Sequence, residues 1–226
     1  MFQSFVRALA CDSLEKRLNL MKKRLPRATG RFNAVCALFL LASASLASVG
    51  HAKEVPIFSV APAESSIRFD VKASVPIEGT FDKWDATLTF ISPDVTTGEL
   101  DVKAQAASVD TGSGIKNRKL KGADFFYVDQ YPLITFRSTK IVQAGPDTFE
   151  LDGDFTIRGV TKSEKLTLTV SGQGTGSGQV NGTMAFDRKD YGMNSSIPFI
   201  RIADRVEVTV ALKVHRVSGP PLVFNP

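Results

Sequence analysis

From Ile67 onward, apolar and polar residues alternate in short runs, a pattern typical of β-strands with one buried face. The first run, residues 67–81, keeps one parity throughout, which predicts a long strand that bends near Pro76 and Gly79. Later runs of the same kind bring the total to about eight strands. These later runs are residues 86–90, 100–106, 134–136, 149–157, 166–170, 180–186 and 206–214.

Short, turn-forming links separate most of these runs, and such links join antiparallel neighbours. Residues 111–127 are the exception, because they lack a period of two and contain a short helical segment at 115–120. Eight antiparallel strands form either a sandwich or an up-and-down barrel. We favour the barrel, since closure removes exposed strand edges. The sequence therefore predicts an all-β domain with a short helical insertion near residues 112–127.

The inward face of these runs combines large and small side chains. An eight-stranded barrel is either just filled by its side chains or holds one small ligand, so the interior decides the function. Large and small residues on one face interdigitate or outline a cavity, and the pattern leaves both open. The large residues are Phe69, Phe81, Phe90, Phe136, Phe149, Phe155 and Phe186, and the small ones are Ala73, Ala104, Ala106, Gly153 and Gly182.

The beginning of the chain has the pattern of an export signal. A stretch rich in Lys and Arg precedes an apolar run at residues 34–49, and Gly50-His51-Ala52 then fits a small-x-small cleavage pattern. We interpret residues 1–52 as a signal peptide, with Met21 as an alternative start. The apolar run is short for a membrane span, so an uncleaved anchor is the weaker alternative.

The rest of the chain divides into a domain at 53–217 and a tail at 218–226. Gly219-Pro220-Pro221 cannot continue a sheet, so we expect the tail to be flexible. The formal net charge of +5 suggests a nucleic-acid binder, but residues 1–52 hold eight basic and two acidic side chains. Residues 53–226 hold 20 basic and 21 acidic side chains. No basic excess remains for a phosphate backbone, and we expect no nucleic-acid partner.

Residues suited to catalysis are scarce. Both cysteines precede residue 53, and the single histidine of the domain, His215, has the parity of an outward position. Thiol chemistry and a structural zinc site are thereby excluded. The carboxylate pairs Asp82/Asp85 and Asp152/Asp154 fall on turns or outward positions, where they solubilise the domain. We expect no enzyme activity, no cofactor and no metal site.

Seven segments keep a characteristic order and spacing along the domain. They are SIRF (66–69), GTFD (79–82), ASVDTG (107–112), LKGADFF (120–126), YPLITF (131–136), FTIRGVTK (155–162) and DRKDYGM (187–193). Together they resemble the YceI-like family of secreted polyisoprenoid-binding proteins over roughly residues 58–217. One position departs from the family, because Ser65 stands where a histidine often precedes the serine of the first strand.

The resemblance implies a lipocalin-like, eight-stranded barrel whose interior holds a quinone, a polyprenyl phosphate or a fatty lipid. It also implies a periplasmic carrier or scavenger. Each buried methylene contributes about 0.8 kcal/mol, so the chain of such a lipid needs no polar contact, and polar residues near the mouth select the head group. By position we expect ligand contacts from Phe69, Phe81, Phe125, Phe126, Phe136, Phe155, Met184 and Phe186, with Asp124, Arg188 and Asp190 near the mouth.

Alternatives stay open at this point. Arg188 is equally a structural brace that pairs with Asp190, and the wall candidates Phe125, Phe126 and Phe136 equally pack the helix against the barrel. A different class of function is a filled barrel whose loops, above all residues 111–127, dock a membrane or redox partner. An enzyme acting on a lipid is a third. A transient membrane contact suits either binding function, and the sequence is compatible with a monomer or a homodimer.

Overall fold

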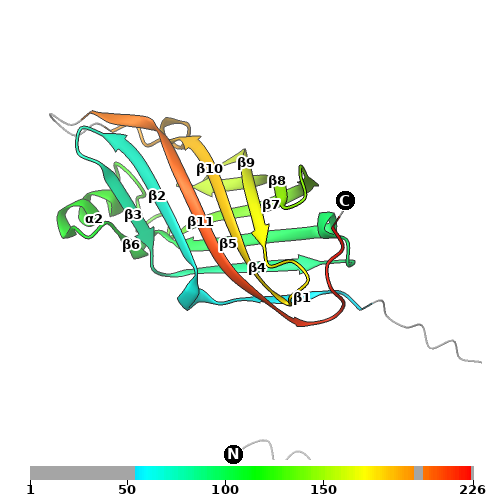
Figure 1. The fold of residues 1–226 in the computed structure, drawn as a ribbon. Coiled ribbons are helices and arrows are strands. Elements are labelled where there is room, and N and C mark those ends of the chain that lie inside the picture. Colours follow the sequence, from blue (N-terminus) through cyan, green and yellow to red (C-terminus); the bar gives the residue numbers. More distant parts are fainter. Residues whose placement is uncertain (1–53, 196–200, 225–226) are drawn as a thin grey trace, which may run out of the picture. The chain divides into compact units, whose positions relative to one another are not determined.

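The computed structural model describes residues 54–195 and 201–224, which contain an eleven-stranded sheet (Figure 1). The expected signal peptide and its cleavage site lie outside these residues. One helix, α2 (Gly114–Lys121), lies within the expected insertion and confirms it. The strands are β1 Ile57–Val60, β2 Ser66–Ala73, β3 Ile77–Phe81, β4 Trp84–Phe90, β5 Gly98–Gln105, β6 Val109–Asp110, β7 Leu133–Gln143, β8 Thr148–Ile157, β9 Val160–Ser171, β10 Ser177–Asp187 and β11 Ile202–Ser218.

The eleven strands form eight runs around a barrel. β1 and β2 are one run, because both pair with β11 on either side of the 3-10 turn η1 (Pro62–Glu64). β3 and β4 form a second run, which pairs with β6 and β5 of a third. Every strand pairing is antiparallel, in the order β4-β5-β7-β8-β9-β10-β11-β2-β3-β6. The eight-stranded antiparallel barrel is confirmed, and short interruptions in three runs raise the strand count.

The expected long strand at residues 67–81 is wrong. The chain reverses after Ala73, and β2 pairs with β3 so that Phe69 stands opposite Gly79. Gly79 marks a close approach, because a Cβ there would lie 2.6 Å from the ring of Phe69. Parity survives the reversal, since β2 and β3 both turn their apolar residues inward. The alternation therefore gives no sign of the hairpin.

The two ends of the barrel carry different elements. Figure 1 places α2 at one end and the C-terminus at the other, beside the link between β4 and β5. The sequence predicts a flexible tail, whereas residues 219–224 have defined partners in the structure. Val223 donates its N–H to the carbonyl of Pro93 over 2.8 Å, and its own carbonyl accepts from the N–H of Val95 over 3.2 Å.

The core lies inside the barrel and contains all seven of the phenylalanines expected to face inward. Phe90 is buried by packing and contacts the ring of Phe58, with centroids 5.8 Å apart. His215 is half-buried rather than fully exposed, and its Nδ1 lies 2.8 Å from the hydroxyl of Ser177. Ser65 lies between β1 and β2 and ties this link to β11. Its hydroxyl donates to the Ala61 carbonyl and accepts from the N–H of Lys213 on β11.

Candidate functional site

A cavity of about 100 Å³ lies inside the barrel at the α2 end, and we call it the helix-end cavity. Its wall comes from strands on all sides of the barrel and from the segment that includes α2. Leu120 is the buried side of α2 and faces this cavity, while the rest of that helix is mostly polar. All eight apolar residues named from the sequence line it, and so does Arg188. They are Phe69, Phe81, Phe125, Phe126, Phe136, Phe155, Met184 and Phe186.

Aromatic contacts set the shape of the helix-end cavity. The Phe126 ring lies 6.3 Å from that of Phe69 and 5.8 Å from that of Phe81, so the segment after α2 packs against the β2–β3 hairpin. Phe126 thus both lines the cavity and packs the insertion on the barrel. At Gly153, a Cβ would lie 2.5 Å from the ring of Phe136. The small and large inward residues therefore interdigitate, and a cavity remains beside them.

Arg188 is buried, and all three of its guanidinium nitrogens form hydrogen bonds. Its Nε donates to the carbonyl of Ala203 over 3.1 Å, and its Nη1 donates to the carbonyls of Met193 and Ser195. Its Nη2 contacts a carboxylate oxygen of Asp204 at 3.0 Å. Because a guanidinium has five donors in a fixed fork, these four acceptors employ most of its capacity. Arg188 is a structural brace, and its ion-pair partner is Asp204 rather than the expected Asp190.

The two acidic residues expected at the mouth lie outside both cavity walls. Asp124 is exposed and forms an ion pair with Lys119. The hydrogen bond from Lys119 is the largest cause that lowers the pKa of the Asp124 carboxyl. Asp190 is also exposed, and its carboxylate lies 3.2 Å from the ammonium of Lys162. Neither carboxylate faces the apolar interior.

A second cavity of about 110 Å³ lies at the opposite end, and we call it the tail-end cavity. The alternating pattern of the sequence does not reveal this cavity. The alternation of β4 and β8 points Phe90 and Phe149 inward, but it does not indicate that the tail closes the space above them. Its wall is formed mainly by β1, β4, β8, β11, the β9–β10 hairpin and the tail. Leu100 lines both cavities, so both border this side chain inside the barrel.

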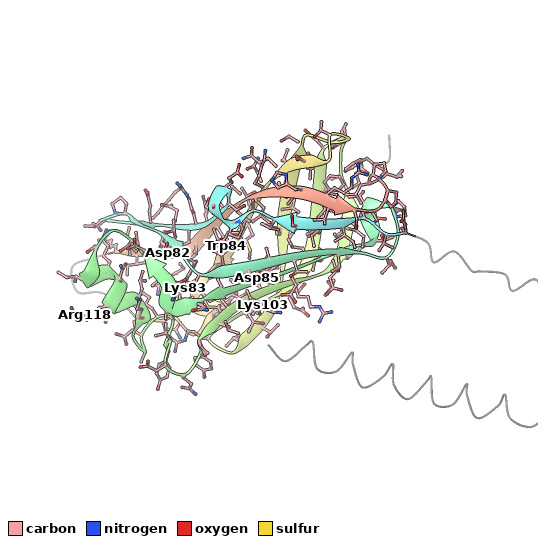
Figure 2. All side chains as sticks on the ribbon, turned by 90° about the horizontal axis from the view of Figure 1, so that it is seen from below. Asp82, Lys83, Trp84, Asp85, Lys103 and Arg118 are labelled. Atoms are coloured by element: carbon pink, nitrogen blue, oxygen red, sulfur yellow. The ribbon has the colours of Figure 1, made fainter. Side chains whose placement is uncertain are left out.

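The interior that the described residues form is almost free of charge. Arg188 and Arg216 are the charged residues of the two cavity walls, and no carboxylate lines either one. Charges gather outside, as Figure 2 shows for Asp82, Lys83, Asp85 and Lys103 on the side of the barrel and for Arg118 on α2. Within residues 54–195 and 201–224, no His, Cys, Asp and Glu side chains are grouped as metal ligands. No helix in the same residues is long and apolar enough to cross a membrane.

The geometry defines a class of protein: a closed antiparallel barrel with an apolar, hollow interior and a helical insertion at one end. The YceI-like domain model matches residues 58–214, and this chain belongs to the YceI-like family. The expected family membership is thus confirmed.

Several relatives share this similarity. A UPF0312 protein of Pseudomonas savastanoi pv. phaseolicola is 29% identical over 133 residues, which cover 57% of this chain and 69% of that protein. Protein YceI of Shigella flexneri is 36% identical over 96 residues, 42% of this chain and 50% of that protein.

Solved structures agree with the fold. BcnA of Burkholderia cenocepacia superposes with a TM-score of 0.63 at 26% identity, covering 69% of this chain and 99% of BcnA. A polyisoprenoid binding domain from Saccharophagus degradans superposes with a TM-score of 0.56 at 16% identity, covering 71% of this chain and 99% of that domain. At this low identity, the second match concerns the fold alone.

Proposed function

We propose that this protein binds an elongated isoprenoid lipid in the barrel interior and carries or sequesters it in the periplasm. The observation that carries the proposal is the pair of apolar cavities within one barrel that both border Leu100. Two cavities in line suit a long, narrow ligand better than a compact one. The alternative of a filled barrel that serves as a docking module predicts no such space.

The size of the cavities bears on the length of the ligand. An engineered apolar cavity of about 150 Å³ holds one benzene molecule. Each cavity here is smaller than that, so a chain of several isoprene units has to occupy both and displace Leu100 at their junction. Each methylene that leaves water then contributes about 0.8 kcal/mol. The isoprenoid class is also the one named for the Saccharophagus degradans domain, which shares this fold.

The polar groups favour recognition through the chain of the lipid rather than through its head group. Arg188 is committed to three carbonyls and Asp204, and Asp124 and Asp190 are paired with lysines at the surface. A quinone and a polyprenyl phosphate are both compatible with such a site. Binding rather than catalysis also agrees with cavity walls that hold no carboxylate to act as an acid or base.

Lipid extraction tests this function. Protein purified from the periplasm is extracted with solvent, and the extract is analysed by mass spectrometry beside a Leu100→Phe variant. We expect a stoichiometric isoprenoid in the wild type and a clear loss of it in the variant, because the larger ring fills the junction of the cavities. Lys103→Phe adds the same ring to the outside of the same strand and should retain the lipid.

Two results would contradict the proposal. One is a wild-type protein that is empty as purified and stays empty after incubation with quinones and polyprenyl phosphates. The other is a folded Leu100→Phe variant that retains its lipid as well as Lys103→Phe does. Thermal melts of both variants establish that each is folded before the extracts are compared.

A further inference from the structure

The C-terminal tail forms part of the wall of the tail-end cavity. Pro221, Leu222 and Phe224 line this cavity, whereas Val223 between them is exposed. The ring of Phe224 packs on that of Phe149, with centroids 6.0 Å apart. The tail therefore has the alternation of a strand, with two side chains turned inward and one turned out. This short pattern is the signal in the sequence that the tail packs.

Backbone geometry holds the tail in this position. Gly219 has a φ of +80°, and a Cβ there would collide with the carbonyl of Val55, so glycine is needed for the turn out of β11. Arg216 then donates to the carbonyl of Gly219 over 3.3 Å. Beyond the two prolines, a parallel bridge joins Val223 to Asp94 in the link between β4 and β5. The tail thus crosses the end of the barrel opposite α2 (Figure 1).

The tail also lies outside the part of the chain that the family model matches, which ends at residue 214. The barrel itself is shared with the family, but this end wall is formed by residues that the family match does not include. The wall is therefore a feature through which this chain can differ from its relatives in the ligand that it accepts.

From these observations we infer that Leu222 and Phe224 are an end wall that limits the length of the apolar chain bound in the barrel. This inference rests on the proposed function. A chain whose polar end lies at the charge-rich α2 end passes Leu100 and enters the tail-end cavity, where these two side chains stop it. Longer chains have to displace the tail, and shorter chains leave the tail-end cavity partly empty.

Competition between chain lengths tests the end wall. The full-length mature protein is mixed with equal amounts of linear polyprenols from geranylgeraniol to solanesol, and native mass spectrometry measures the ratio of long to short chains bound. The double variant Leu222→Ala/Phe224→Ala should raise this ratio at least about tenfold, because each further methylene is then buried instead of excluded. Val223→Ala removes a similar side chain from the outer side of the tail and should leave the ratio unchanged.

A second variant displaces the end wall without changing its side chains. Gly219→Val dislodges the turn before the tail, and it should raise the ratio in the same direction as the double variant. The outcomes separate the two proposals. A wild type that binds no polyprenol of any length overturns the proposed function. A wild type that binds polyprenols, with the same length ratio in the double variant or with an equal shift in Val223→Ala, overturns the end wall alone.

Discussion

At the α2 end of the barrel, closure depends on a buried guanidinium and a cluster of aromatic rings, whereas at the tail end it depends on six residues and a few backbone hydrogen bonds. Arg188 ties Ala203, Met193, Ser195 and Asp204 together, and these partners lie on β11 and in the segment that follows β10. The tail is tied to the Pro93–Val95 turn through Val223. The closing contacts at the α2 end are therefore part of the barrel, whereas the tail only lies across the opposite end.

This difference separates stability from selectivity. A buried polar brace cannot be removed without leaving its partners unsatisfied in a low-dielectric interior, so the α2 end should tolerate little change. A surface segment with few backbone hydrogen bonds, such as the tail, opens locally at low cost. Evolution can therefore alter the tail without endangering the barrel, which makes the tail end the better place for a determinant of ligand length.

The largest effect should come from Arg188→Met, which removes the charge but retains much of the volume of the side chain. We expect a loss of about 3–5 kcal/mol in the free energy of unfolding, because three carbonyls lose their donor and Asp204 keeps only its contact with Lys189. Urea denaturation of the variant and the wild type measures this loss. A loss below about 1 kcal/mol would mean that the α2 end does not depend on the brace.

A pair of truncations compares the two ends directly. Phe126→Ala should cost about 3–5 kcal/mol, because this ring is buried between Phe69 and Phe81. Phe224→Ala should cost only about 1 kcal/mol, since its ring is half-buried and packs chiefly on Phe149. Both values come from urea denaturation under the same conditions. Equal losses would show that the tail is as integral to the fold as the α2 insertion.

The sequence predicts the barrel far better than it predicts its ends. Alternation marks which side chains face inward, so the sequence alone assigns Phe69, Phe136 and Met184 to the interior, and all three line the helix-end cavity. Alternation is blind to chain reversal, which is why it predicts one strand where the β2–β3 hairpin lies. A position near the expected mouth of the barrel suggests head-group candidates, but it says nothing about their partners. Lys119 and Lys162 engage two of them, and Asp204, sixteen residues from Arg188, engages the third.

Tyr191→Phe probes the α2 end at a finer scale. Tyr191 is fully buried, and its hydroxyl donates to a carboxylate oxygen of Glu164 over 2.8 Å. Burial, followed by this hydrogen bond, raises the pKa of the phenol, so the hydroxyl stays protonated and continues to donate. Loss of one such bond should cost about 1–2 kcal/mol in urea denaturation. An unchanged free energy of unfolding would show that the half-buried Glu164 finds an equally good partner in water.

The smallest predicted effect is the loss of stability at low pH. This loss should also differ between the two ends of the barrel. Hydrogen bonds lower the pKa of Asp110, Asp124 and Asp204 at the α2 end, and of Asp94 at the tail end. For Asp204 the first cause is the hydrogen bond from Lys189. A carboxyl whose folded pKa is lowered contributes stability that is present above its unfolded pKa of about 3.9 and is lost as the pH falls through the folded pKa.

Asp204→Asn removes this contribution at every pH. The melting temperature of the variant should lie below that of the wild type at pH 7, and the gap should narrow as the pH falls below about 4, where the wild-type carboxyl also becomes neutral. Asp94→Asn is the matched variant at the tail end, and it should show a smaller gap because the Asp94 carboxylate accepts its hydrogen bonds from Thr96, a neutral residue in its own turn. A gap for Asp204→Asn that stays constant from pH 7 to acid would assign its effect to packing. A gap for Asp94→Asn as large as that for Asp204→Asn would show that carboxylates stabilise the two ends of the barrel equally.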